Sequence, residues 1–245
     1  NAKSGLDGII AAETTLSHVD GEGGRLIVRG IELRELVATR GFEDVAALLW
    51  DGFALGGGDA AAVHAGLAAA RQHAAALVPS VLAEAGRLAP IELLRLGLAR
   101  LSDSEAMPHH YLLCGAAPVL VAAIARNAPV EPDPTLGTAA DLLRMLRGAR
   151  ASAAEEKALD PYLATVADHG FNASTFTARV VASTQAGMIS AAIAALSALK
   201  GPLHGGAPGP VLDMLDAIGT PENVGPWLER ALESGERLMG FGHRV

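Results

Sequence analysis

The hydrophobic positions after Gly30 follow a helical period along most of the chain. Apolar residues three or four apart predict helices over residues 60–77, 90–101, 111–125, 139–146, 211–218 and 224–234, with shorter helical turns near 31–37 and 45–52. Residues 174–200 form the longest such run, and we expect one helix there that ends at Gly201-Pro202. Three prolines between Pro129 and Pro134 predict a loop.

The pattern before Gly30 is different. Residues 9–19 and 25–29 flank Asp20-Gly21-Glu22-Gly23-Gly24, which is turn chemistry between two short strands. The sequence therefore predicts an all-α protein with a short N-terminal β-hairpin.

Composition narrows the classes of partner. The chain has 245 residues, of which 50% are hydrophobic and 4% aromatic. Its net charge is −8 and it has no basic run, which argues against nucleic acid as a partner.

The lone Cys114 fits a reducing compartment, so we expect a cytoplasmic protein in which this residue is a small buried side chain rather than a nucleophile. The N-terminus lacks the pattern of a signal peptide. Residues 180–199 carry no charge, but their serines, threonine, glutamine and many alanines favour a buried helix over a membrane span.

Three segments combine a histidine with a probable helix end. His169 stands in Asp-His-Gly-Phe-Asn172, His204 in Gly-Pro-Leu-His-Gly-Gly, and His243 in Gly-Phe-Gly-His-Arg244. Glycines beside His204 can adopt backbone angles closed to other residues, and glycines beside His243 let a ligand approach the backbone. An imidazole can polarise a carbonyl or act as a general acid. Arg244 adds a fixed positive charge, and Asn172 is a candidate helix cap.

Each segment also has a simpler interpretation on its own. His204 fits a solvent-facing loop histidine, and His169 with Asn172 fits a helix-capping cluster. The remaining histidines lack the spacing of a metal pair with a nearby carboxylate, so we expect no metal site and assign them to surface or core positions: His18, His64, His73, His109 and His110.

Taken together and in this order, the three segments resemble the citrate synthase family, including the 2-methylcitrate synthases. The match runs through Ala-Asp-His169-Gly-Phe-Asn172-Ala-Ser-Thr-Phe-Thr, Leu-Lys-Gly-Pro-Leu-His204-Gly-Gly-Ala and Gly-Glu-Arg-Leu-Met-Gly-Phe-Gly-His243-Arg-Val. The resemblance implies a mostly helical fold with a large domain over residues 1–203 and the start of a smaller helical domain over 204–245. It also implies a homodimer.

The resemblance further implies an acyltransferase that condenses acetyl-CoA with oxaloacetate and then hydrolyses the thioester, without a cofactor. By that analogy His204 stabilises the enol or enolate and His243 polarises the oxo-acid carbonyl. His169, Asn172 and Arg244 would hold oxaloacetate. The backbone of Leu238, Met239, Gly240, Phe241 and Gly242 would cradle the CoA adenine.

The resemblance implies further site residues beyond His-Arg-Val. In the family an aspartate that removes the methyl proton and further substrate arginines follow this motif, so we expect the intact gene product to continue past Val245. Departures at Gly170 and Pro208, where many relatives have Glu and Asn, leave the substrate open. The alternatives are a 2-methylcitrate synthase that uses propionyl-CoA, a non-catalytic paralogue that binds CoA or a dicarboxylate, and a plain helical scaffold.

Overall fold

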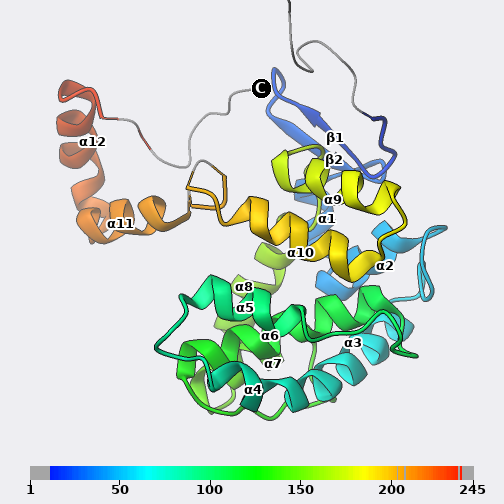
Figure 1. The fold of residues 1–245 in the computed structure, drawn as a ribbon. Helices are drawn as coiled ribbons and strands as arrows, with labels where there is room; N and C mark the ends of the chain where they lie inside the picture. The colour runs from blue at the N-terminus through cyan, green and yellow to red at the C-terminus, as the bar shows by residue number, and fades with distance from the viewer. Residues whose placement is uncertain (1–11, 203, 207, 237, 239–245) are drawn as a thin grey trace, which may run out of the picture. The chain divides into compact units, whose positions relative to one another are not determined.

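The computed structural model describes residues 12–202, 204–206, 208–236 and 238. These residues form two compact units, an N-terminal unit of residues 1–171 and a C-terminal unit of residues 172–245. Helices dominate both units, which confirms the predicted all-α class (Figure 1). The predicted division into domains at residues 203 and 204 stays a prediction.

A small antiparallel sheet opens the N-terminal unit. Strand β1 (Ser17–Asp20) pairs with β2 (Arg25–Val28), so that Ser17 lies opposite Val28, and β2 pairs with β3 (Ile31–Glu32). Asp20 holds the turn, because its carboxylate accepts from Gly23 N at 2.8 Å and from the Arg25 side chain at 2.7 Å. The predicted hairpin is confirmed, but residues 12–16 lie outside the strand and a third strand was not predicted.

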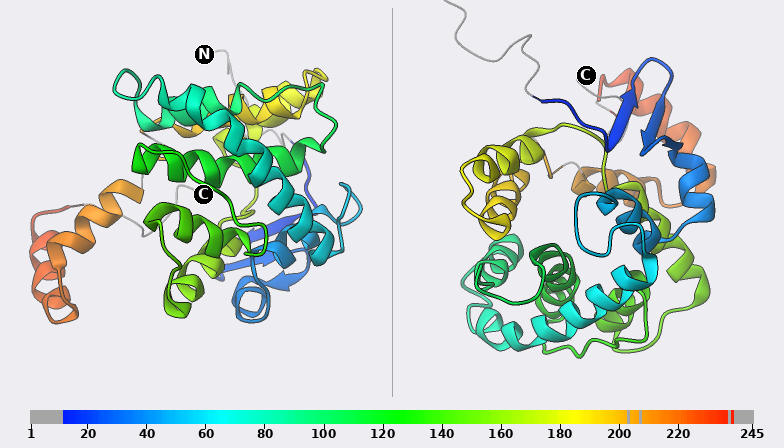
Figure 2. Two further views of the ribbon diagram at one scale, coloured as in Figure 1. Left: turned by 90° about the horizontal axis from the view of Figure 1, so that it is seen from below. Right: turned by 90° about the vertical axis from the view of Figure 1, so that its right-hand side faces the viewer.

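In the N-terminal unit, α6 (His109–Arg126) packs against α3, α4, α5 and α7, and its most extensive contact is with α3 (Ala60–Ala74). Figure 2 shows these helices from two further sides. Most predicted ranges are confirmed to within a few residues, although 60–77 ends in a 3-10 turn and the α-helix at 90–101 stops at Leu98. Two helices were missed, namely α4 and α8. The elements are α1 (Leu33–Thr39), α2 (Phe42–Trp50), α3 (Ala60–Ala74), η1 (Ala75–Leu77), α4 (Val78–Leu82), α5 (Pro90–Leu98), α6 (His109–Arg126), α7 (Thr138–Arg147) and α8 (Ala153–Thr165).

Two glycines set the spacing of α3 and α6. A Cβ added at Gly66 would lie 2.6 Å from the Tyr111 ring, and one added at Gly115 would lie 2.5 Å from Ala70 Cβ. These separations are too short for carbon atoms, so the helices approach more closely than any side chain there would permit. Among the described residues α6 is the one helix long and apolar enough to cross a bilayer; half of it is buried in the protein, as a core helix is.

A buried ion pair joins α3 to α7. Arg71 and Asp141 are 1% and 0% exposed, and the Nε of Arg71 donates to Asp141 Oδ2 at 2.8 Å. The other Arg71 nitrogens donate to Thr138 Oγ1 and to the carbonyl oxygen of Leu136. Asp141 also accepts from the Arg144 side chain and from Asp133 N. Every charge in this network therefore has hydrogen-bond partners, which buried charges require.

The C-terminal unit corrects the prediction of one helix over 174–200. The structure has two packed helices, α9 (Ala173–Ser183) and α10 (Met188–Leu199). Gln185 and Gly187 have φ values of 60° and 89°, which an α-helix cannot contain, so the chain turns between the two helices. The longest helix is therefore α6 within the described residues. The remaining elements are α11 (Pro208–Ile218), η2 (Pro221–Asn223) and α12 (Val224–Glu233). The two α-helices agree with the predicted ranges to within three residues, and η2 was not predicted.

Candidate active site

His204 lies just after the end of α10, in a turn that fixes its backbone. Its N–H donates to Gly201 O at 3.0 Å, and the next residue, Gly205, donates to Leu199 O at 2.9 Å. A Cβ at position 205 would lie 2.3 Å from the same Leu199 oxygen, so only glycine fits this turn. Glycine beside His204 is therefore required by close backbone packing, while Gly205 is not among the described residues of positive φ that the sequence led us to expect here.

The His204 side chain is half-buried and contacts the start of α9. Its Nε2 lies 2.9 Å from Ser174 Oγ, and Ser174 Oγ lies 2.7 Å from Asn172 Oδ1. One hydroxyl therefore links two residues that the sequence assigned to the site. Ser174 was not predicted, because nothing in the sequence shows a contact between residues thirty positions apart.

Asn172 is the N-cap of α9, as predicted. Its Oδ1 accepts from Ser174 N at 3.1 Å and from Thr175 N at 3.0 Å, while Thr175 Oγ1 accepts from Asn172 N at 2.8 Å. Two backbone donors at the helix start are satisfied by this arrangement. The Ser174 hydroxyl has one hydrogen, which it can donate either to Asn172 Oδ1 or to His204 Nε2.

His169 belongs to the N-terminal unit and is exposed at the middle of a turn. Asp168 Oδ1 accepts from Gly170 N at 3.2 Å and also from Ser17 Oγ. Gly170 has φ +83°, in the left-handed region that favours glycine.

The third histidine segment is mostly outside the described residues. Leu238 is described and is half-buried. Six predicted site residues lie outside the described part of the chain: Met239, Gly240, Phe241, Gly242, His243 and Arg244. Their assignments stay predictions.

Three of the other histidines have polar partners of their own, away from the predicted site residues. His73 approaches Glu105 at 3.5 Å, His109 approaches Asp103 at 3.9 Å, and His110 Nε2 lies 3.1 Å from Leu55 O. Burial lowers the pKa of His110, and the neighbouring charge of His109 adds to this. The described residues hold no group of three or more side chains that could bind a metal ion.

Cys114 packs against the helix core beside Tyr111. Burial raises the pKa of its thiol to about 11, so the thiol stays protonated at neutral pH. A protonated thiol is a poor nucleophile, which agrees with the prediction of a small core residue.

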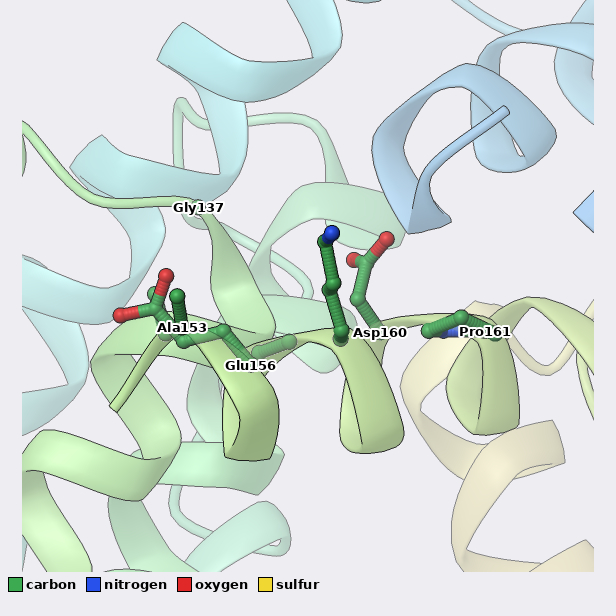
Figure 3. Close-up of a pocket in the computed structure, with 8 residues that line it drawn as sticks. Gly137, Ala153, Glu156, Asp160 and Pro161 are labelled. Carbon is green, nitrogen blue, oxygen red and sulfur yellow. The ribbon is translucent and has the colours of Figure 1, made fainter. Parts of the chain in front are cut away.

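A pocket of about 400 Å³ opens in the N-terminal unit between α7 and α8. Figure 3 shows Asp160 and Glu156 on the α8 side of this pocket and Gly137 across from them. It contains none of the predicted site residues. Burial raises the pKa of the Asp160 carboxyl, and the charges of Glu43 and Asp44 raise it further, against the effect of a hydrogen bond from Phe42 N.

Comparison with known proteins decides the family. The model of the citrate synthase C-terminal domain matches residues 5–245. The chain belongs to the citrate synthase family.

Relatives and structures agree with this assignment. A citrate synthase of Acidithiobacillus ferridurans is 34% identical, with all of this chain and 68% of that protein covered. A 2-methylcitrate synthase of Mycobacterium tuberculosis is 33% identical over 99% of this chain and 65% of its own length. A ternary complex of citrate synthase from Thermoplasma acidophilum with carboxymethyl coenzyme A and oxaloacetate has a TM-score of 0.77 at 26% identity, with 97% of this chain and 66% of that chain covered.

The chain thus spans about two thirds of the length of these relatives. The expected citrate synthase-like fold and enzyme family are confirmed.

Proposed function

We propose that the protein condenses acetyl-CoA with oxaloacetate, giving citrate and CoA by way of an enol or enolate. The observation that carries this proposal is the contact between His204 and Ser174, because it places the assigned imidazole at a defined hydrogen-bonding partner. Family membership supplies the reaction class, and the geometry indicates how this chain would perform its part.

Ser174 would fix the tautomer of His204. When the serine hydroxyl turns its one hydrogen from Asn172 Oδ1 to Nε2, the ring proton of neutral His204 lies on Nδ1, which can donate to the thioester oxygen. As a carboxylate base takes the methyl proton of acetyl-CoA, charge develops on this oxygen, and a donor already in place stabilises the enolate. The nucleophilic carbon would then form a bond to the keto carbon of oxaloacetate, whose carbonyl π electrons move to the keto oxygen, and that oxygen would take a proton from His243. Water would then hydrolyse the thioester and release CoA.

The other assigned residues would bind the substrates. His243 would donate to the keto oxygen of oxaloacetate, while His169, Asn172 and Arg244 would hold its carboxylates. Backbone groups of 238–242 would bind the CoA adenine. We also propose a homodimer and a cytoplasmic location, since an acidic chain with one buried thiol fits a reducing compartment.

Turnover of His204 variants in the full-length protein tests the proposal. Thiol release from acetyl-CoA with oxaloacetate is expected to fall by about 10²–10⁴-fold in His204→Ala. Ser174→Ala keeps the imidazole of His204 but removes the hydroxyl that contacts it, so kcat is expected to fall by about tenfold. Ser197→Ala is the matched control, because in the described part of the chain this hydroxyl bonds the local carbonyl of Ile193 and no site residue.

The outcomes separate the alternatives. Near wild-type turnover in His204→Ala would refute the assigned role. A higher kcat/KM with propionyl-CoA than with acetyl-CoA would favour 2-methylcitrate synthase. Calorimetric binding of CoA or oxaloacetate by a wild type without turnover would favour the non-catalytic paralogue.

A further inference from the structure

We propose that Ser17 and Asp168 are positioning residues for His169, so that strand β1 sets the place of a substrate-binding histidine. This inference rests on the proposed function, in which His169 contacts oxaloacetate. It adds the N-terminal hairpin to the parts of the chain that determine how tightly that substrate binds.

One carboxylate oxygen carries the connection. Asp168 Oδ1 accepts the hydroxyl of Ser17, which lies 151 residues earlier in the chain. The same oxygen accepts from Gly170 N at 3.2 Å. His169 is therefore the middle residue of a turn. One atom, Asp168 Oδ1, accepts hydrogen bonds both from Ser17 of β1 and from Gly170, the residue after His169.

The backbone of the turn also lies against β1. A Cβ added at Gly170 would be 3.6 Å from Val19 Cγ2 and 3.8 Å from Ser17 Oγ, which is ordinary van der Waals contact. The pairing of Ser17 with Val28 in turn holds β1 against β2, whose Val28 is 1% exposed in the core. Ser17 thus links an exposed turn to a buried element.

The chemistry of the pair suits a site for a dianion. A bare carboxylate beside His169 would repel the carboxylates of oxaloacetate. Donors on Oδ1 offset that charge, while the exposed imidazole remains directed by a turn with little freedom. Loss of either donor would let the turn move, and small displacements of a binding group weaken the ligand's fit.

Kinetics and binding of the full-length protein test the role of the pair. Ser17→Ala is expected to raise KM and the calorimetric Kd for oxaloacetate about tenfold, with KM for acetyl-CoA unchanged. Ser17→Thr keeps the hydroxyl on the strand and is expected to restore oxaloacetate binding. Asp168→Asn keeps an acceptor without the charge, and its KM and Kd for oxaloacetate are expected to lie between those of Ser17→Ala and Ser17→Thr.

Thr14→Ala is the matched control, since the bond that this hydroxyl makes within the described residues is to the nearby N–H of Leu16. Its oxaloacetate affinity is expected to equal that of the wild type, and the melting temperatures of all variants are expected to stay close together.

The results distinguish the positioning role of Ser17 and Asp168 from the proposed enzyme function on which it rests. A wild type that neither binds nor turns over oxaloacetate overturns both. If His169→Ala weakens oxaloacetate binding while Ser17→Ala and Asp168→Asn do not, the positioning role alone is wrong. Equal losses for oxaloacetate and acetyl-CoA in Ser17→Ala would show a general structural role and would also overturn the proposal.

Discussion

At the scale of single residues, the Asp160 carboxylate accepts a hydrogen bond at the start of α2 but is repelled by nearby acidic side chains. Its Oδ1 accepts from Phe42 N at 3.2 Å at the start of α2, close to the acidic Glu43 and Asp44. Its pKa is raised above the ordinary value of 3.8, so the folded protein holds this proton more tightly than the unfolded chain does. The stabilisation that protonated Asp160 gives the fold is fully present at pH values below its ordinary pKa. It is lost as the pH rises through the pKa of the folded protein.

Asp160→Asn is therefore expected to stabilise the fold at pH 7, by less than about 1 kcal/mol, because the group is only partly buried. The amide oxygen still accepts from Phe42 N, and the repulsion disappears. Thermal melts at pH 7 and at about pH 3 check this, since the difference is expected to vanish once the wild-type carboxyl is protonated. Asp160→Ala removes the acceptor and is expected to destabilise; a destabilised Asp160→Asn at pH 7 would contradict the prediction.

Asp141 presents the opposite case of a fully buried charge. Asp141→Asn is expected to lower the free energy of unfolding by about 3–5 kcal/mol, because it leaves the buried guanidinium of Arg71 without its countercharge. Urea denaturation measures the change. Arg87→Met is the control, since its pair with Glu84 is exposed and is expected to matter by less than about 0.5 kcal/mol. Equal effects from the two substitutions would refute the argument.

The residue scale also marks where prediction from sequence ends. The glycine-flanked His204 and the cap Asn172 could be found because turns and caps depend on neighbouring residues. Ser174 and Ser17 could not, since each acts through a contact that exists only after folding. The part of the third segment beyond Leu238 stays a prediction.

At the scale of elements, helix α8 was missed although a local signal was present. Residues 153–165 have no continuous apolar stripe, and Pro161 lies inside the helix. The signal was Ser152-Ala-Ala-Glu155, in which Ser152 and Glu155 form a capping box. The single helix over 174–200 was predicted in error because the alanine-rich pattern continues across the turn between α9 and α10. That turn depends on the positive φ angles of Gln185 and Gly187, which the pattern does not show.

Substitutions at Gln185 distinguish two helices from one. In the observed turn Gln185 has a positive φ, so Gln185→Gly is expected to stabilise by about 0.5–1 kcal/mol. In a continuous helix the same change would destabilise by about 1 kcal/mol. The free energy of unfolding from urea titration gives the sign. Gln185→Ala is the control, expected to change little here and to stabilise a continuous helix.

At the scale of the whole molecule, the C-terminal unit leaves large apolar side chains of α9 and α10 exposed. Val180 is 50% exposed and Met188 47%. These exposed apolar side chains and the small residues of α10 fit the proposed homodimer.

Val180→Arg is expected to shift the protein toward monomer in sedimentation velocity at micromolar concentration. The side chain is half exposed in one chain, so the fold should tolerate the charge. Leu212→Arg on α11 is the control at a similarly exposed position. A wild-type monomer, or a dimer that survives Val180→Arg, would contradict the predicted interface.

The contact of α3 with α6 has a consequence for reading sequence variation in this protein. In a library that samples every amino acid at every position, Gly66 and Gly115 should return almost only glycine, since even a methyl group collides with the facing helix. A survey that scored positions by intolerance alone would group them with the histidines of the site. Their intolerance would report the distance between two helices and nothing about catalysis.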